Sequence, residues 1–202
     1  DPSQLTWYNA TNNDLTCIET TDPAWATANW TYENGKIDQG VDFSLVCAPE
    51  GYTYVPDNNF EQALIDLGYD DVIDNYVVTD SINGITYLNV AEKEISDLTG
   101  IEAFASLYHL RIEDNSLTAL DLNSNTALGI LRCWNNQLTA LDVSNNTLLT
   151  HLKVGTNQLT TLDVSNNIEL TTLWVGFNSL NSLDVSTNTA LIDLRVGGNQ
   201  LT

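Results

Sequence analysis

The chain has 202 residues, of which 27 are Asp or Glu and only 6 are Lys or Arg, so its formal net charge is −21. A chain this acidic has no general attraction for nucleic acid or for anionic lipid. Apolar residues make up 43% and charged residues 16% of it, which is not the composition of a disordered acidic tail. No run of about eighteen apolar residues occurs, so we expect no membrane insertion.

The first 47 residues contain two of the three cysteines, Cys17 and Cys47. The segment between them has little periodic apolar pattern of its own and would gain stability from a covalent link. This favours a disulfide formed in an oxidising compartment, and two reduced, buried thiols are the alternative. No Cys-x-x-Cys pair and no cluster of Cys and His occurs, so we expect no zinc site.

A short linker, residues 48–51, precedes a segment with the pattern of an amphipathic helix, VPDNNFEQALIDLGYDD. Four apolar residues have the i, i+3, i+4, i+7 spacing of one helix face: Phe60, Ala63, Leu64 and Leu67. Asp57 or Asn58 is the predicted N-cap, with Glu61 close behind it. Gly68 is a suitable residue for the end of the helix.

From Ile85 onward the chain repeats itself. A degenerate copy of 22 residues starts at Ile85, and units with a step of 21 residues follow, starting at Leu107, Leu128, Leu149, Leu170 and Leu191. Positions 1, 4, 6, 11, 14 and 16 of each unit are apolar, and positions 3 to 7 alternate as a strand with one buried face does. No unit can bury these side chains alone, so the pattern predicts stacked coils around one continuous core.

Two columns of asparagine are predicted to be structural. An amide side chain offers donors and an acceptor, which the backbone groups at the turns of a solenoid need. Position 9 contributes Asn115, Asn136, Asn157, Asn178 and Asn199, and position 19 contributes Asn125, Asn146, Asn167 and Asn188. Cys133 occupies position 6 of its unit and is expected to be a buried core thiol.

The unit LxxLxVxxNxLxxLDVSxNTx resembles the leucine-rich repeat over residues 85–202, and its 21-residue form is similar to repeats of secreted surface proteins of Bacteroidetes. The resemblance implies a right-handed parallel β-solenoid, with a strand at positions 3–7 lining the concave side, and binding rather than catalysis. The Leu-Asp-Val half leaves no room for a helix of about ten residues. We therefore expect a mostly β array without convex α-helices.

The remaining segments resemble the caps of this family. Residues 52–84 resemble a helical N-terminal cap, in which the helix covers the first coil together with Val72, Ile73, Tyr76 and Val77. Residues 1–47 resemble a last repeat, at 5–16, and an irregular C-terminal cap whose apolar lid is Trp25, Trp30 and Phe43. An aromatic platform for sugars is the alternative for these three rings.

This order of caps leads us to divide the chain into 1–47, 48–51, 52–84 and an array at 85–202 that is cut within a repeat. A closing cap then precedes an opening cap. We therefore expect the chain to be a slice through at least two tandem arrays of a longer protein. A polymer of one repeating module is the other possibility.

The few positive charges are placed unevenly. Four of the six basic residues share position 5 of the predicted strands with one tryptophan: Arg111, Arg132, Lys153, Trp174 and Arg195. Near them lie His109 and His151 at position 3, Trp134 at position 7 and Phe177 at position 8. One interpretation is a basic and aromatic stripe that binds an anionic glycan or an acidic protein surface, with Trp134 and Trp174 stacking on the ligand.

The other interpretation of this column is structural. Acidic neighbours such as Glu113 and Asp193 would compensate the positive charges, and the long side chains would simply cover the sheet. The sequence leaves both interpretations open.

A second charged column occupies position 15: Asp121, Asp142, Asp163 and Asp184. Its spacing could hold calcium, but we expect each carboxylate to accept hydrogen bonds from turn amides and to stay solvated, with no metal.

The sequence contains no GxSxG, no HExxH and no glycine-rich phosphate loop, so we predict neither an enzyme nor a cofactor. The predicted function is a bacterial extracellular or cell-surface module for binding or adhesion. The alternative is a purely structural spacer or filament protein, whose tandem arrays associate head to tail.

Overall fold

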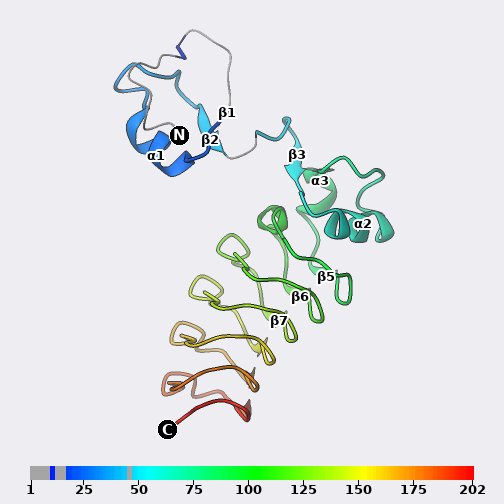
Figure 1. Ribbon diagram of the computed structural model, residues 1–202, viewed down its shortest axis with the longest axis vertical. Helices are drawn as coiled ribbons and strands as arrows, with labels where there is room; N and C mark the ends of the chain where they lie inside the picture. Colours follow the sequence, from blue (N-terminus) through cyan, green and yellow to red (C-terminus); the bar gives the residue numbers. More distant parts are fainter. Residues whose placement is uncertain (1–9, 12–16, 45–46) are drawn as a thin grey trace. The chain divides into compact units, whose positions relative to one another are not determined.

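The computed structural model describes residues 10–11, 17–44 and 47–202, and the chain divides into two compact units, Asp1–Glu50 and Gly51–Thr202. Figure 1 shows both units, with the second containing a stack of successive coils. Within the described segments, no helix has the length and apolar character needed to cross a membrane.

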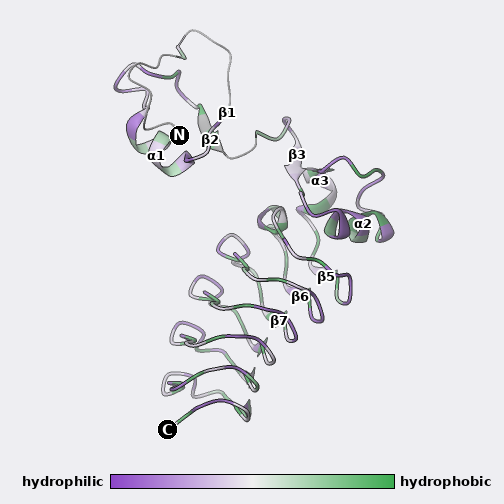
Figure 2. Cartoon of the chain, viewed as in Figure 1, coloured by the Kyte–Doolittle hydropathy of each residue, from purple (hydrophilic) through white to green (hydrophobic). Residues whose placement is uncertain are grey.

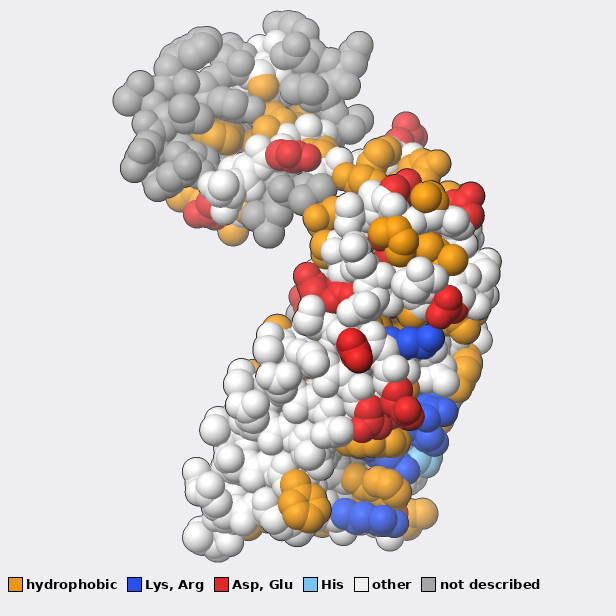
Figure 3. Space-filling view, turned by 45° about the vertical axis from the view of Figure 1, so that its right-hand side comes forward, with side chains coloured by type: hydrophobic (Ala, Val, Ile, Leu, Met, Phe, Trp, Pro, Cys, Tyr) orange, Lys and Arg blue, Asp and Glu red, His pale blue; other side chains and the backbone are white. Residues whose placement is uncertain are grey.

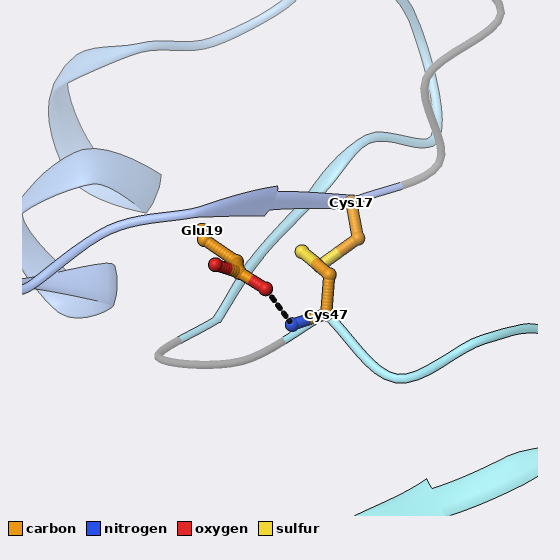
Figure 4. The surroundings of a disulfide bond; sticks show 3 residues. All are labelled: Cys17, Glu19 and Cys47. Atoms are coloured by element: carbon orange, nitrogen blue, oxygen red, sulfur yellow. Dashed lines mark hydrogen bonds between the residues drawn. A yellow bond between two sulfur atoms is a disulfide. The ribbon is translucent and has the colours of Figure 1, made fainter.

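The first unit is held by a short parallel sheet and a disulfide. Strand β1 (Cys17–Glu19) pairs with β2 (Asp42–Ser44), and helix α1 (Pro23–Asn29) lies between them in the chain. The carboxylate of Asp22 caps α1 by accepting from Trp25 N at 2.9 Å. The predicted Cys17–Cys47 disulfide is confirmed, and Glu19 Oε1 accepts from Cys47 N at 3.2 Å beside it (Figure 4).

A small apolar core fills this unit: Ala10, Ala26, Trp30, Ile37 and Val41, with Ile18, Trp25 and Phe43 packed against it. The rings of Trp25 and Phe43 lie 5.5 Å and 5.7 Å from the ring of Trp30, measured between centroids. Ala10 and Thr11 are the described part of the predicted repeat at 5–16, and the rest of that repeat falls outside the described residues. Ala10 pairs with Ile37 and joins this core.

The second unit begins with a cap built from two strands and two helices. Strand β3 (Tyr52–Tyr54) pairs antiparallel with β4 (Tyr76–Val78), and helix α2 (Asn58–Asp66) lies between them in the chain. Helix α3 (Thr79–Ile82) follows β4 directly. Asp57 is the N-cap of α2, and Gly68 adopts a positive φ of 79° just beyond its end, as predicted for a helix stop.

Helix α2 buries Phe60, Ala63 and Leu64 in the core of the second unit. Leu67 was predicted on the same face but is 43% exposed, because the helix ends at Asp66 and the chain turns away. Glu61 is buried and does not form a capping box. Its Oε1 accepts from the backbone N–H groups of Asp74 and Tyr76, at 2.9 Å and 3.2 Å.

The prediction that Val72 and Ile73 help to cover the first coil is wrong, and the contacts of Glu61 explain why. They fix the segment before β4 against α2 and leave Val72 and Ile73 in an outer turn, where they are 50% and 41% exposed. Val77 does join the core of the second unit, and Tyr76 is half-buried.

The carboxylate of Asp57 links the start of α2 to the first coil. Asp57 Oδ1 accepts from the backbone N–H groups of Asn59 and Phe60 at the start of α2. Asp57 Oδ2 accepts from the backbone and the hydroxyl of Ser96, both at 2.8 Å, and from Asp97 N at 3.0 Å. Partial burial raises the pKa of this carboxyl, but the hydrogen bonds from Ser96, Asp97 and Phe60 outweigh burial and lower it.

We predict that Asp57→Ala lowers the free energy of unfolding by about 2 kcal/mol, because the variant loses a helix cap and the link to Ser96 and Asp97. The folded-state pKa lies below the ordinary value, so the stabilisation is present at neutral pH and is lost as the pH falls below about 4. Urea unfolding at pH 7 and pH 3 measures both effects. An equal cost of the substitution at the two pH values would contradict the assigned ionisation.

The coils of the second unit stack through one parallel six-stranded sheet. Its strands run in chain order: β5 (Tyr87–Asn89), β6 (His109–Arg111), β7 (Ile130–Arg132), β8 (His151–Lys153), β9 (Thr172–Trp174) and β10 (Asp193–Arg195). Each strand covers positions 3–5 and not the predicted 3–7. Backbone bonds between coils nevertheless continue beyond the strands, as in Phe177 N to Gly197 O at 2.8 Å.

The rest of each coil is extended or turn-like, apart from the 3₁₀ turn η2 (Ile101–Ala103), and residues 85–202, all described, contain no α-helix. The central leucine of each strand from β5 to β9 has no exposed surface, and the hydropathy colours in Figure 2 recur from coil to coil. Burying each such leucine contributes about 1.5–3 kcal/mol.

The position-9 asparagines bond to backbone groups of two successive coils. Asn136 Oδ1 accepts from Leu117 N of the preceding coil at 3.0 Å, and its Nδ2 donates to the carbonyl oxygens of Ile112 and Cys133. The same pattern recurs at Asn115, Asn157, Asn178 and Asn199.

The position-19 asparagines use only their donors. Asn146 Nδ2 donates to the carbonyl oxygens of Leu122 and Asn125, at 3.0 Å and 2.9 Å. The Oδ1 atoms of this column are buried without a hydrogen-bond partner among the described residues: Asn125, Asn146, Asn167 and Asn188.

Candidate binding surface on the parallel sheet

The outer face of the six-stranded sheet carries the side chains that the sequence singled out. In each strand the middle residue points into the core, so the residues before and after it point outward. The sheet register places the position-5 residues side by side, and we call them the basic column: Arg111, Arg132, Lys153, Trp174 and Arg195. Figure 3 shows basic side chains gathered along one side of the solenoid, next to hydrophobic ones.

Two of the four cations in the basic column have acidic partners. Arg111 forms an ion pair with Glu113, with Nε 2.8 Å from Oε1, and Glu113 is almost completely buried. Arg195 pairs with Asp193 through Nε and Oδ1 at 3.1 Å. These hydrogen bonds raise the pKa of Arg111 and lower the pKa of Asp193.

The other two cations, Arg132 and Lys153, have no ion-pair partner among the described residues. Arg132 Nε is buried and has no hydrogen-bond partner in that part of the chain. Partial burial and the neighbouring charges of Arg132 and Arg195 lower the pKa of Lys153. Glu113 and Asp193 therefore form ion pairs with only two of the four cations of the basic column.

Trp174 lies between two cations. Lys153 Nζ is 3.3 Å and Arg195 Cζ is 3.7 Å from the centroid of its ring, and the two side chains come from the strands on either side. Its Nε1 donates to Asp193 Oδ2 at 2.8 Å. Both cations lie within cation–π distance of the ring, so Trp174 holds Lys153 and Arg195 beside it. Its predicted stacking on a ligand stays a prediction.

The two histidines at position 3 are not neighbours, because Ile130 lies between His109 and His151 in the sheet. The ring of His109 meets the ring of Tyr87 edge-on, with centroids 4.9 Å apart. Burial and the charges of Arg132 and Arg111 lower the pKa of His109. His151 Nδ1 lies 3.0 Å from Thr150 Oγ1.

A hollow of about 280 Å³ lies on this face, in the coils that contain β7 to β10. Its lining contains five predicted site residues, Trp134, Lys153, Trp174, Phe177 and Arg195, together with Gly155, Thr156 and Gly176. The last three were missed by the sequence analysis. A signal for them exists, because position 7 carries Glu113 and Trp134 in two coils and glycine in the next three.

The aspartates at position 15 lie outside this surface. In each, Oδ1 accepts from the backbone N–H two residues later, at 2.8–2.9 Å, as in Ser165 N to Asp163. That bond lowers the pKa of Asp142, Asp163 and Asp184. Across the described part of the chain, no group of three or more His, Cys, Asp or Glu side chains could hold a metal ion.

Comparison with solved structures identifies the architecture. The functional domain of InlJ from Listeria monocytogenes, which includes a cysteine ladder, is similar at a TM-score of 0.56 and 28% identity, over 79% of this chain and 45% of that one. The internalin InlF from the same species is similar at a TM-score of 0.56 and 26% identity, over 61% of this chain and 38% of that one. The array has the leucine-rich-repeat fold.

A leucine-rich-repeat protein from Leptospira interrogans shares this fold, with a TM-score of 0.54 and 22% identity over 61% of this chain and 34% of that one. The present chain spans less than half the length of each of these proteins. No protein-family model and no curated protein sequence matches it. The residues that stack from coil to coil at positions 9 and 19 of this leucine-rich-repeat array are asparagines, and Cys133 is the one cysteine of the array.

Proposed function

We propose that this chain is a non-catalytic binding or adhesion module that acts outside a bacterial cell or at its surface, and that its partner is a protein that contacts the outer face of the parallel sheet. One observation carries the proposal. A chain of net charge −21 places four of its six basic residues in a single column of that face, and leaves Arg132 and Lys153 without acidic partners among the described residues.

The arrangement of this column is unfavourable without a ligand. The register sets Arg111, Arg132 and Lys153 directly beside one another, and like charges that face each other across neighbouring strands repel. A partner with an acidic surface would relieve this repulsion and would be steered to this face of the molecule. The similarity to internalins supports a protein partner, and the Cys17–Cys47 disulfide supports an oxidising, extracellular setting.

The test compares two double variants that change the net charge equally in the same two coils. Arg132→Gln with Lys153→Gln removes the two unpaired cations of the sheet face. Thr139→Asp with Thr160→Asp adds two negative charges at exposed positions outside the sheet. On an array of bacterial and host extracellular proteins, followed by interferometry of the hits, we expect the first variant to weaken binding at least about tenfold and the control to leave it unchanged.

Equal effects of the two double variants would mean that net charge alone matters, which contradicts a binding face on the sheet. Binding only to anionic glycans, lost in the first variant, would replace the protein partner by a carbohydrate. Association of the chain with itself in the absence of any ligand, measured by sedimentation, would favour the structural spacer predicted as the alternative.

A further inference from the structure

The hollow beside Trp174 contains a side chain in an unfavourable state. Phe177 has a φ of 58° and is 71% exposed. The positive φ belongs to its place in the coil, because Asp114, Asn135 and Thr156 adopt φ values of 53–58° at the same position. Asn and Asp adopt this conformation readily, whereas it is unfavourable for the β-branched Thr156 and for the bulky Phe177. A strained and exposed aromatic side chain points to a role in binding.

The chain around Phe177 is packed too closely to admit side chains at the neighbouring glycines. A Cβ atom added to Gly176 would lie 2.8 Å from the carbonyl oxygen of Gly197, and one added to Gly198 would lie 2.7 Å from Cδ1 of Phe177. A Cβ on Gly155 would lie 3.0 Å from the carbonyl oxygen of Gly176. The two glycines that line the hollow, Gly155 and Gly176, therefore form a floor of closely packed backbone, and the ring of Phe177 lies close to Gly198.

The lining of the hollow defines the chemistry of an occupant. Aromatic rings and glycine backbone form most of it, Lys153 and Arg195 supply positive charge, and Thr156 supplies one hydroxyl. No carboxylate or amide side chain lines it. A sugar ring needs hydrogen-bond partners for hydroxyls on most of its edge, and a buried hydroxyl without a partner costs binding free energy. A flat apolar group with a carboxylate beside it suits this lining better, because the apolar group contacts the aromatic rings and the carboxylate pairs with a cation.

We propose that this hollow holds an aromatic side chain from an acidic segment of the protein partner, with Phe177 contacting the ring of that side chain and Lys153, which has no acidic partner among the described residues, pairing with a flanking carboxylate. This inference rests on the proposed function, because it names what the sheet face recognises. Trp174 keeps the two cations in place beside the glycine floor, so little reorganisation is needed on binding. Aromatic side chains in such pockets commonly dominate the affinity of an interface.

The experiment selects ligands for the whole chain from a displayed library of random linear peptides. We expect the enriched peptides to carry an aromatic residue within two positions of Asp or Glu. Phe177→Asn should weaken a synthesised consensus peptide at least tenfold by calorimetry. The matched control is Ile168→Asn, which removes another exposed apolar side chain of the array, and it should leave the affinity within twofold. Because Asn suits a positive φ, we expect Phe177→Asn to melt no lower than the parent.

The outcomes separate this inference from the function on which it rests. Arg132 lies in the basic column but outside the lining of the hollow. Peptides whose affinity falls in Arg132→Gln but not in Phe177→Asn would show that the hollow is not the binding site, and would leave the sheet face as a binding surface. Binding that responds to neither would overturn both. No enriched peptide, a glycan ligand lost in Phe177→Asn, or a clear fall in melting temperature in that variant would each overturn the assignment of an aromatic side chain to the hollow.

Discussion

Replacement of Asn136 by alanine is expected to lower the free energy of unfolding of the array by about 3 kcal/mol or more. The side chain is 8% exposed, and its amide bonds the N–H of Leu117 and the carbonyl oxygens of Ile112 and Cys133. Alanine would leave these backbone groups without that partner inside the solenoid, and each such buried group costs about 1–3 kcal/mol. The loss also falls between two coils, where stacked repeats obtain their stability.

Urea unfolding followed by circular dichroism measures the total effect of Asn136→Ala, and hydrogen exchange locates it. The amide of Leu117 should exchange faster in the variant, because it loses its acceptor. Gln137→Ala is the matched control, since its side chain is exposed and adjacent in sequence, and we expect it to stay within about 0.5 kcal/mol of the parent. Equal costs at the two positions would show that the asparagine column does not hold the coils together.

Removal of the disulfide is expected to unfold the first unit and to leave the array folded. The bridge closes 30 residues between Cys17 and Cys47, and a loop of this length corresponds to about 3–4 kcal/mol of stabilisation. The buried apolar core that the described residues of this unit form around Trp30 has only five members, and a core of that size would not replace this contribution. The double variant Cys17→Ser with Cys47→Ser should therefore lose hydrogen-exchange protection over residues 17–44 and keep it over residues 85–202.

A reducing agent provides the control for this variant. It should reproduce the loss of protection in the parent and have no further effect on the double variant, because Cys133 is a buried free thiol whose pKa burial raises. Unchanged protection around Trp30 after reduction would mean that packing alone holds the first unit. Loss of protection in the array would mean that the two units depend on each other for stability.

The repeat made most of the array predictable. A strict step of 21 residues specifies which residues of successive coils are neighbours, so the parallel register and the neighbours in the basic column follow from counting. The helix at Asn58–Asp66 was predictable for a similar reason, because its apolar residues and its cap at Asp57 are local in the chain. Periodicity carries this information because it depends only on spacing along the backbone.

Contacts that depend on competition between side chains were not predictable in this way. Glu61 lies in the first turn of the helix, close behind the N-cap, but it bonds the backbone of Asp74 and Tyr76, and Val72 and Ile73 lie outside the core. The sequence suggests that Trp174 stacks on a ligand, but it does not show that Lys153 and Arg195 lie against the ring of Trp174. Each outcome depends on which of several partners is closer in space, and the sequence does not state this.

The charges of the chain also divide into features that the sequence determines and features that only the tertiary structure determines. Composition and spacing alone establish an acidic repeat protein in which four of the six basic residues share one column of a sheet. The tertiary structure decides that two of these cations are neutralised, that two are not, and that glycine and Phe177 open a hollow beside them. The physical reason is that a period determines which residues meet, whereas burial, side-chain geometry and backbone strain determine which of their groups remain available to a partner.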